Sequence, residues 1–256
     1  MRLVRVIGQW LPKGWGDALR QVGLFVLADV CYETVRGVAE GKTAVAFANA
    51  DRLVDVEKAT GTFFEPDLQG ALISQHWLID AANWMYMNTH FVITTSFLVW
   101  LYLFRNDSFY FVRNMFMVAM GLALVGYTLF PTAPPRLLPE EGFVDTITDF
   151  AQVNHDSALI KLFVNPYAAV PSMHIAFALM ISLPAIRIAR HAVTRLFWAL
   201  YPLLVLFVVV VTANHFWLDA AAGALVAALS ALVAAHVLAR VRPGTWSWRP
   251  ATGAAT

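Results

Sequence analysis

The chain is poor in cysteine, in charge and in nucleotide-binding motifs. Its single cysteine, Cys31, excludes an internal disulfide and any zinc site that is built from cysteines. Charged residues make up 14% of the 256 residues and the net charge is +1, which argues against nucleic acid as a partner. No glycine-rich nucleotide-binding loop and no internal repeat can be detected. Disulfide-stabilised and nucleic-acid-binding proteins are therefore poor matches to this chain.

Apolar residues dominate the chain instead. They are 59% of all residues, and the mean hydropathy is +0.61. A soluble domain could not cover so much apolar surface with polar side chains. The composition therefore predicts an all-α integral membrane protein.

Six apolar runs approach the length of a transmembrane helix, and together they form one predicted membrane domain at residues 18–240. The first run holds Asp29 and Glu33, and these charges interrupt it too early for a signal peptide. A cytoplasmic lead-in at residues 1–17 precedes the domain, and a tail at 241–256, which we expect to be disordered, follows it. The six predicted spans cover about residues 18–36, 77–104, 114–130, 167–186, 196–213 and 215–239.

Two segments between the spans are too polar to cross a membrane. Residues 42–75 alternate apolar and charged positions and are punctuated by Gly61 and Pro66, which predicts one or two helices lying on the outer interface. Such helices could form a lid or a lipid entry wall, or they could only connect the first two spans. Residues 131–166 are rich in proline and acidic residues and form a predicted extracytoplasmic loop.

Basic residues gather on one side of the six predicted spans. That side holds both termini and the connections after the second and fourth spans, and it carries twelve of the eighteen basic residues but only two of the seventeen acidic residues. The positive-inside rule therefore places both termini in the cytoplasm of a multi-pass cell-membrane protein. The starts of the fourth and sixth spans then lie on the extracytoplasmic side, together with residues 131–166.

A histidine and an aspartate open the sixth predicted span, in the sequence Asn214-His215-Phe216-Trp217-Leu218-Asp219. If the helix includes both residues, His215 and Asp219 are four apart and share one face. The carboxylate can then accept the N–H of one ring nitrogen and leave the other unprotonated, which makes the imidazole a nucleophile. The alternative interpretation is a pair that only caps and solvates the helix terminus.

A second histidine opens the fourth predicted span, in the sequence Pro171-Ser172-Met173-His174. Pro171 followed by Ser172 indicates a helix start, with the serine hydroxyl available as a cap. The free N–H groups of a helix start attract anions. Two helices therefore each begin with a histidine on the same predicted side, and one of these starts is suited to bind a phosphate group.

These residue types match the needs of phosphate-ester chemistry. Cleavage of such an ester needs an attacking atom, a proton for the departing oxygen and donors around the phosphoryl oxygens. His215 can attack as a neutral imidazole and form a phosphohistidine, while His174 can protonate the leaving group and then activate the acceptor. Arg136 and Ser172 can bind the phosphate, and the scheme requires no metal and no organic cofactor.

The two motifs and a third, Phe130-Pro131-Thr132-Ala133-Pro134-Pro135-Arg136, resemble those of the type-2 phosphatidic acid phosphatase (PAP2) superfamily. The resemblance covers roughly residues 40 to 240, and its specificity lies in the set of motifs. The Pro-Pro turn after the third core helix is most similar to the branch of the inositol-phosphorylceramide synthases, which are inositolphosphotransferases. The resemblance implies a PAP2-like helical core and catalytic roles for His174, His215 and Asp219.

Two positions depart from the pattern of the superfamily's phosphatases. Those enzymes usually have a lysine seven residues before the arginine of the first motif and an arginine six residues before the nucleophile, whereas this chain has Leu129 and Val209. The first-motif arginine also precedes a proline in them, whereas Arg136 follows two prolines. A site with fewer cations suits a phosphodiester with one negative charge better than a dianionic monoester. Lys161, or another cation, could replace a missing one.

Five further residues are candidates for the surroundings of the site. One lies within the second span beside polar residues, and two tyrosines flank the ends of the motifs. One asparagine precedes the nucleophile, and another lies in the predicted loop just before the fourth span. A structural hydrogen bond, helix capping or a position at the membrane interface would explain the same residues. The five candidates are His90, Tyr127, Asn165, Tyr167 and Asn214.

Three classes of function remain open from the sequence. The favoured one is a lipid phosphotransferase that moves a phospho-head group from a phospholipid donor to a lipid or polyol alcohol. A lipid phosphate phosphatase, for phosphatidate or a polyprenyl phosphate, would use the same residues with water as the acceptor. A transporter or other non-enzymatic membrane protein would use His215 and Asp219 to relay protons or to stabilise packing. Zinc bound by these two residues and His174 is a further alternative. The expected partners are a lipid substrate and the bilayer, and the sequence does not define an oligomeric state.

Overall fold

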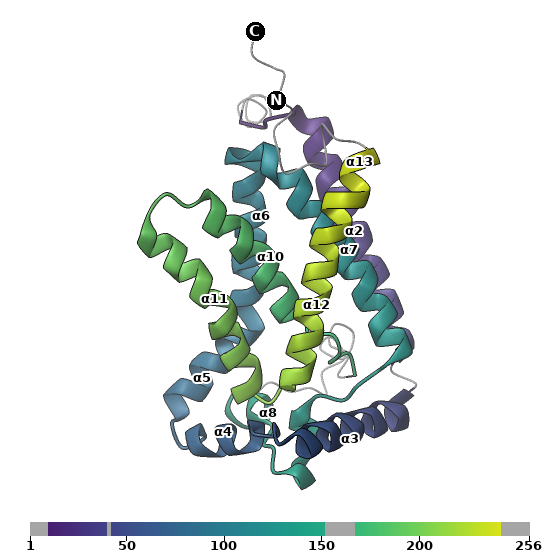
Figure 1. Cartoon of the computed structure of the whole chain (residues 1–256), viewed down its shortest axis with the longest axis vertical. Helices are drawn as coiled ribbons and strands as arrows, with labels where there is room; N and C mark the ends of the chain where they lie inside the picture. Colours follow the sequence, from purple (N-terminus) through teal and green to yellow (C-terminus); the bar gives the residue numbers. More distant parts are fainter. Residues whose placement is uncertain (1–9, 40–41, 152–166, 242–256) are drawn as a thin grey trace.

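The computed structural model describes residues 10–39, 42–151 and 167–241. Within these ranges the regular structure is helical, and the β-type pairing is confined to one isolated bridge between Thr132 and Ala168. Figure 1 shows long helices running along the long axis of the molecule, with short helices gathered at one end. The helical character predicted from the sequence is therefore confirmed for the described residues.

The long helices follow the order of the predicted spans. The second predicted span is broken by a π-helical segment, η2, and the last one continues through a second π-helical segment, η5, into a short final helix. The elements are α2 (Gly14–Ala39), α5 (His76–Trp84), η2 (Met85–Thr89), α6 (His90–Phe104), α7 (Asn106–Leu129), α10 (Met173–Ile188), α11 (Ala192–Val211), α12 (Trp217–Val233), η5 (Ala234–Leu238) and α13 (Ala239–Val241).

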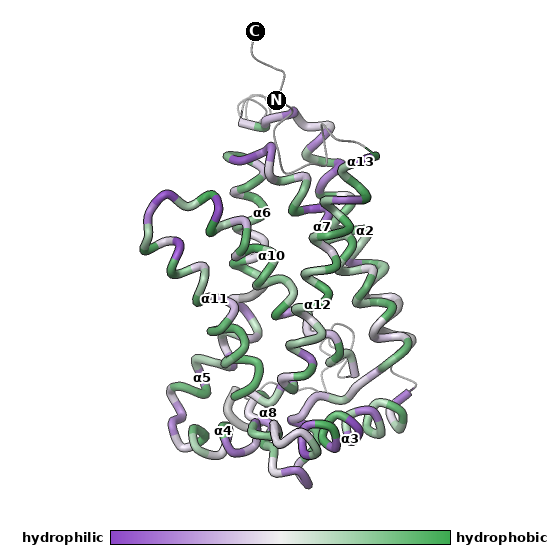
Figure 2. The backbone as a smooth tube through the Cα atoms, viewed as in Figure 1, coloured by the Kyte–Doolittle hydropathy of each residue, from purple (hydrophilic) through white to green (hydrophobic). Residues whose placement is uncertain are grey.

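Three of these helical stretches are long and apolar enough to cross a membrane: α7, α11 and the stretch Trp217–Val241. The pair His76–Thr89 and Phe91–Phe104 adds a fourth if a bend of 41° is allowed within one span. Helix α10 has 16 residues and α2 carries several charges, so neither reaches that standard. Figure 2 shows hydrophobic residues along the long helices and hydrophilic residues towards both ends. Several apolar helices indicate a membrane protein, and the count of six spans stays a prediction.

Several helix boundaries differ from the predicted ones. The last long helix begins at Trp217 and not at His215, because Ala213 has a φ of +52° and Phe216 is extended. The fourth begins at Met173 and not at residue 167, because Thr132 and Ala168 pair as extended chains beside it. The third begins eight residues earlier than expected, at Asn106, since the aromatic residues around Tyr110 are buried within the helix.

The end of the molecule that carries both histidines is closed by short helices. Residues 42–75 form two helices, as predicted, and α3 runs across this end at a steep angle to α7 and α12 (Figure 1). The predicted loop at 131–166 contains three short helices, and its residues 152–166 lie outside the described part. The tail from residue 242 onwards lies outside it too. The short elements are α3 (Thr43–Thr60), α4 (Glu65–Leu72), η3 (Pro135–Leu137), η4 (Pro139–Glu141) and α8 (Thr146–Ala151).

Close backbone packing holds the start of α10 against its neighbours. Helix α10 packs on α11, α12 and α7. A Cβ atom on Gly223 of α12 would lie 2.2 Å from the carbonyl oxygen of Ser172, and one on Gly126 of α7 would lie 2.7 Å from Cδ of Pro171. Since no side chain larger than hydrogen fits there, these two glycines determine where the Pro171-Ser172 segment sits.

Candidate active site

His215 lies in a tight turn between α11 and α12. The backbone N–H groups of Asn214 and His215 both donate to the carbonyl oxygen of Val209, at 3.0 and 3.1 Å. The Asn214 side chain donates to Thr212 Oγ1 at 2.8 Å, within the same turn. The His215 residue is 5% exposed. These hydrogen bonds hold the backbone of the turn and so fix the position from which the imidazole projects.

Asp219 lies beside the His215 ring. Its Oδ2 atom is 3.3 Å from His215 Nδ1 and accepts the backbone N–H of Phe216 at 3.0 Å. Because His215 precedes the helix, the carboxylate reaches back over the first turn of α12, and the expected shared helix face is wrong. Asp219 is 0% exposed, and its Oδ1 has no hydrogen-bond partner among the described residues. With Nδ1 directed at the carboxylate, Nε2 is the nitrogen left for chemistry.

His174 approaches His215 from the second residue of α10. The two ring centroids are 5.5 Å apart, with the ring planes at 59°. The His174 ring also stacks on the ring of Tyr86 in η2, with ring centroids 4.4 Å apart and ring planes at 23°. Tyr86 was not among the sequence candidates, because an aromatic residue within a span has no signal that separates it from packing. It positions the His174 ring by direct contact.

Ser172 is the residue before α10, as expected, but its hydroxyl does not cap the helix. The Oγ atom is buried and has no hydrogen-bond partner among the described residues. Its backbone N–H donates to the carbonyl oxygen of Asp219 at 3.0 Å, which joins the two motif segments directly. Tyr127 is buried and its hydroxyl donates to the carbonyl oxygen of Pro171 at 3.1 Å, so this side chain supports the segment from α7.

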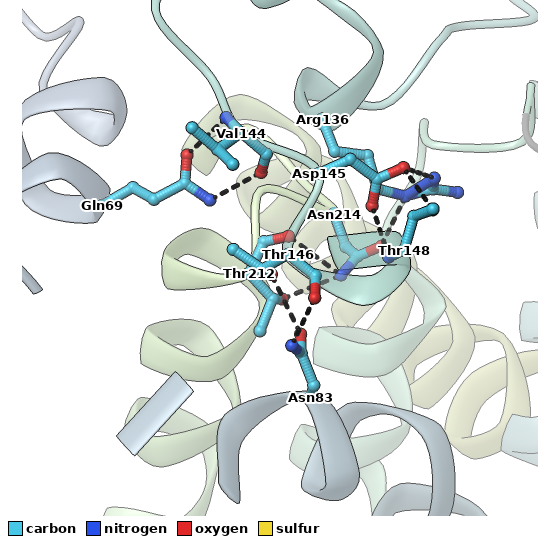
Figure 3. A network of polar contacts seen from close by, with 9 residues as sticks. All are labelled: Gln69, Asn83, Arg136, Val144, Asp145, Thr146, Thr148, Thr212 and Asn214. Atoms are coloured by element: carbon cyan, nitrogen blue, oxygen red, sulfur yellow. Dashed lines mark hydrogen bonds and ion pairs between the residues drawn. The ribbon is translucent and has the colours of Figure 1, made fainter. Parts of the chain in front are cut away.

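Arg136 joins the turn that carries His215. Its backbone N–H donates to the Ala213 carbonyl at 2.8 Å, and its Nε donates to Asn214 Oδ1 at 3.0 Å. A guanidinium nitrogen also lies 3.6 Å from Asp145 Oδ2, and this ion pair was not predicted from the sequence (Figure 3). The arginine is thus placed next to the residue that precedes His215, and part of its charge is balanced by Asp145.

Amide side chains anchor the segment around Asp145. Gln69 of α4 donates to the carbonyl of Val144 and accepts its N–H, at 3.0 and 2.9 Å, and it also donates to the Val211 carbonyl at 3.2 Å. Asn83 of α5 makes two hydrogen bonds with Thr146 (Figure 3). Both amides are buried. The network connects the acidic loop to α4, α5 and the end of α11, and so fixes the Asp145 partner of Arg136.

Three of the five additional candidates make structural contacts with the motif segments or the short helices. Tyr167 contacts Phe47 of α3 edge-on, with ring centroids 6.2 Å apart, and its carbonyl accepts the N–H of Thr132. It therefore packs the short helices together. Asn214 bonds Arg136 and Tyr127 supports Pro171, as described above. Asn165 and the side chain of His90 lie outside the described residues.

Two buried glutamates that the sequence did not single out lie at the start of α12. Glu65 Oε1 accepts the backbone N–H of Trp217 at 3.0 Å, and Glu57 Oε1 accepts that of Leu218 at 3.4 Å. Both residues are 0% exposed. Burial raises the pKa of Glu57 to about 9, and the adjacent Glu65 carboxylate is the second cause.

The two positions with missing cations differ in their surroundings. Leu129 is 76% exposed at the end of α7, whereas Val209 is 0% exposed and its carbonyl holds the His215 turn. An arginine at position 209 would therefore have to displace packed neighbours. Within the described residues, no group of three or more His, Cys, Asp or Glu is arranged to hold a metal ion.

Comparisons with known proteins give one family. Neither the curated proteins nor the solved structures contain a match to this chain. The model of the PAP2 superfamily matches residues 51–233, which include the first motif and both histidines. This match spans more than half of the sequence and takes in α7, α10, α11 and most of the last long helix. The chain is a member of the PAP2 superfamily.

Proposed function

We propose that this protein is a membrane-embedded lipid phosphotransferase that moves a phospho-head group from a phospholipid donor to an alcohol acceptor through a phosphohistidine at His215. The observation that carries the proposal is the approach of the His174 and His215 rings, whose centroids are 5.5 Å apart beside the buried Asp219. Membership of the PAP2 superfamily supports phosphatase or phosphotransferase chemistry on lipid phosphates.

In the first step, Nε2 of His215 attacks the phosphorus atom and forms an N–P bond. The Nδ1–H group donates to Asp219 Oδ2 and stabilises the positive charge that the ring acquires. The bond between phosphorus and the leaving alkoxide oxygen breaks, and His174 donates its proton to that oxygen. The donor lipid leaves as an alcohol, and its head group remains on His215.

In the second step, each histidine reverses its own role: His174 acts as a base and His215 as the leaving group. The neutral His174 accepts a proton from the incoming alcohol, whose oxygen attacks the phosphorus atom. The N–P bond breaks and His215 is released as a neutral ring that still donates to Asp219. With water in place of the alcohol, the same steps would make the protein a phosphatase, so the acceptor alone separates the two functions.

The donors around the phosphoryl group favour a singly charged diester. The Ser172 hydroxyl has no partner among the described residues, and Ser172 is the N-cap of α10, whose first N–H groups can also donate to an anion. Arg136 is balanced in part by Asp145. Since Leu129 and Val209 supply no charge, the site has less positive charge than a dianionic monoester requires.

A cavity in the long helices supports a lipid substrate. It has a volume of about 610 Å³ and lies between α2, α6 and α7, with apolar side chains such as Phe25, Phe91 and Phe116 in its walls. Phe177, which follows His174 by three residues in α10, also lines it. A cavity of this size and character suits a hydrocarbon chain.

We also propose an orientation in the cell membrane. With both termini in the cytoplasm, the two histidines lie on the extracytoplasmic side.

The test uses purified full-length protein in detergent. It is given a phospholipid that is labelled at phosphorus, with and without a lipid alcohol, and separately a labelled phosphatidate. Transfer of label to the alcohol, lost in His215→Ala, is the expected result. Release of inorganic phosphate from the monoester in the absence of transfer would replace this proposal with the phosphatase.

A further inference from the structure

Three hydrogen bonds join the start of α12 to α3, to α4 and to the turn between them. Two are the backbone contacts from Trp217 to Glu65 and from Leu218 to Glu57. The third joins the Trp217 indole N–H to Thr62 Oγ1 at 3.2 Å. Within the connection itself, the backbone N–H of Phe64 donates to Glu65 Oε2 at 2.9 Å. Glu65 therefore uses both carboxylate oxygens, one on its own helix and one on α12.

These contacts lie one and two residues after the N-cap of the helix that holds Asp219. The N–H groups of Trp217 and Leu218 have no acceptor within α12, since they belong to its first turn. If they were unpaired in a buried position, each would destabilise this helix start. The acceptors from α3 and α4 therefore fix the first turn of α12, and with it the carboxylate that faces His215.

Three carboxyl groups influence one another at this point. Glu57 of α3 is adjacent to Glu65 of α4, and Asp219 of α12 contributes to the negative potential around it. The basic neighbour on α3, Lys58, is directed to Glu141 of η4 and does not balance them. A single proton on Glu57 therefore relieves the repulsion between the three groups, and the raised pKa keeps it there at neutral pH.

We infer that Glu57 and Glu65 form a positioning pair for the proposed nucleophile, in which the two carboxyl groups hold the first amides of α12 and thereby place Asp219 against His215. The inference rests on the proposed function, because it concerns the geometry of that reaction. It also gives residues 42–75 a task beyond connecting two helices. The segment closes over the site and supports the helix that orients the nucleophile.

The pair predicts a loss of turnover in alkaline solution. When the pH rises through about 9, Glu57 loses its proton and a second negative charge appears beside Glu65 and Asp219. Repulsion then moves these groups apart, so the His215–Asp219 contact lengthens and kcat falls. Glu57→Gln keeps a neutral side chain with an oxygen for the Leu218 amide. This variant is expected to retain its kcat at a pH where the unchanged protein has lost it.

The second variant removes the acceptor. An amide at position 65 offers one oxygen to two N–H donors, so Glu65→Gln leaves either Phe64 or Trp217 unpaired. We expect kcat to fall about tenfold to a hundredfold, as for the loss of a charge-assisted hydrogen bond, with little change in KM. The matched control is Glu141→Gln, which removes a carboxylate that contacts the same helix α3 at the exposed Lys58 and does not touch α12. It should leave kcat as it is.

Hydrogen exchange makes the test independent of turnover. The amides of Trp217 and Leu218 should exchange faster in Glu65→Gln than in Glu141→Gln, measured on the full chain in detergent by mass spectrometry. The inference is overturned if these amides exchange equally fast in Glu65→Gln and Glu141→Gln. It is also overturned if the kcat of Glu57→Gln still falls as the pH rises through about 9. If the protein transfers no head group at all, the proposed function fails. The hydrogen-exchange result still shows whether Glu57 and Glu65 hold the first amides of α12. If Glu65→Gln does not fold, the exchange and kcat of Glu57→Gln decide it alone.

Discussion

Two clusters of buried polar side chains lie near opposite ends of α7, and they differ in how completely their atoms are paired. Near the start of α7, Asp17 accepts hydrogen bonds from Gln21, Tyr102 and Tyr110, at 3.0, 3.0 and 2.7 Å. Arg113 donates to Gln21 Oε1 at 2.7 Å. It also donates twice to the neighbouring Asn114, whose Nδ2 is left without a partner in the described part of the chain.

The cluster at the other end keeps its polar atoms available. Ser172 Oγ and Asp219 Oδ1 are buried there without hydrogen-bond partners among the described residues, within a few residues of both histidines. A buried polar atom without a partner costs about 1–3 kcal/mol, and a substrate that pairs with these two atoms would offset that cost. The Arg113 cluster therefore ties α2 to α7, whereas the two unpaired atoms near the histidines lie where the proposed reaction needs groups that can pair with a substrate.

The largest expected effect comes from removing the nucleophile. His215→Ala and His174→Ala should each lower kcat by more than about a thousandfold, because an alanine methyl group can neither attack phosphorus nor transfer a proton. Turnover is measured with the phospholipid donor and the alcohol acceptor. His191→Ala, at the exposed turn between α10 and α11, is the control for loss of a histidine. Activity above a few per cent in His215→Ala would end the phosphohistidine proposal.

A packing change should harm both stability and turnover. Gly223→Ala places a methyl group against the Ser172 carbonyl, so α12 and the start of α10 must separate, at a cost of about 1–3 kcal/mol. Gly121→Ala in α7 is the matched control, because nothing lies within 4 Å of its added Cβ. Thermal unfolding in detergent and kcat are compared for the two variants. If Gly223→Ala behaves like Gly121→Ala, the close approach of the two motif segments is wrong.

A change in the Arg113 cluster should lower stability and leave turnover unchanged. Arg113→Ala leaves the Gln21 and Asn114 oxygens without a buried donor, so the free energy of unfolding should fall by about 1–3 kcal/mol. The kcat of the protein that remains folded should not change. Unfolding and turnover are followed on the same sample. A large fall in kcat per folded molecule would show that this cluster takes part in the chemistry, and the contrast between the two ends would be lost.

The smallest effect distinguishes two unpaired hydroxyls. Ser172 Oγ lies at the site, whereas Ser230 Oγ is buried without a described partner farther along α12. Replacing either by alanine removes a buried unpaired group and should leave stability equal or slightly higher. Only Ser172→Ala should lower kcat, by about fivefold to tenfold, through loss of one hydrogen bond to the phosphoryl group. Equal kcat values in both variants would remove Ser172 from the proposed site.

The sequence predicted the parts of this protein that depend on local patterns. Apolar runs located the long helices to within a few residues in most cases, and the order of the three motifs led to the family. The start of α12 was placed two residues early, because a histidine pattern gives no sign of the positive φ at Ala213. The contacts of Arg136 with Asn214 and of Ser172 with Asp219 arise from the folding of distant segments.

The residues that sequence reasoning missed act through tertiary contacts. Glu57 and Glu65 occupy a segment that alternates apolar and charged positions, which is the pattern of a solvated helix. Their burial follows from the packing of α3 and α4 against the start of α12, where Trp217 lies 152 residues after Glu65. Tyr86 and Asp145 were missed for the same reason. No periodicity places the partner of a histidine or an arginine across the fold.

The central claim is tested most directly by trapping the intermediate. The protein is mixed with phosphorus-labelled phospholipid without an acceptor, quenched in alkali and digested, and the labelled peptide is identified by mass spectrometry. The account predicts a phosphorus adduct on the His215 imidazole that is stable in alkali, labile in acid and absent from His215→Ala. Label on another residue, or full transfer to an alcohol by His215→Ala, would contradict it.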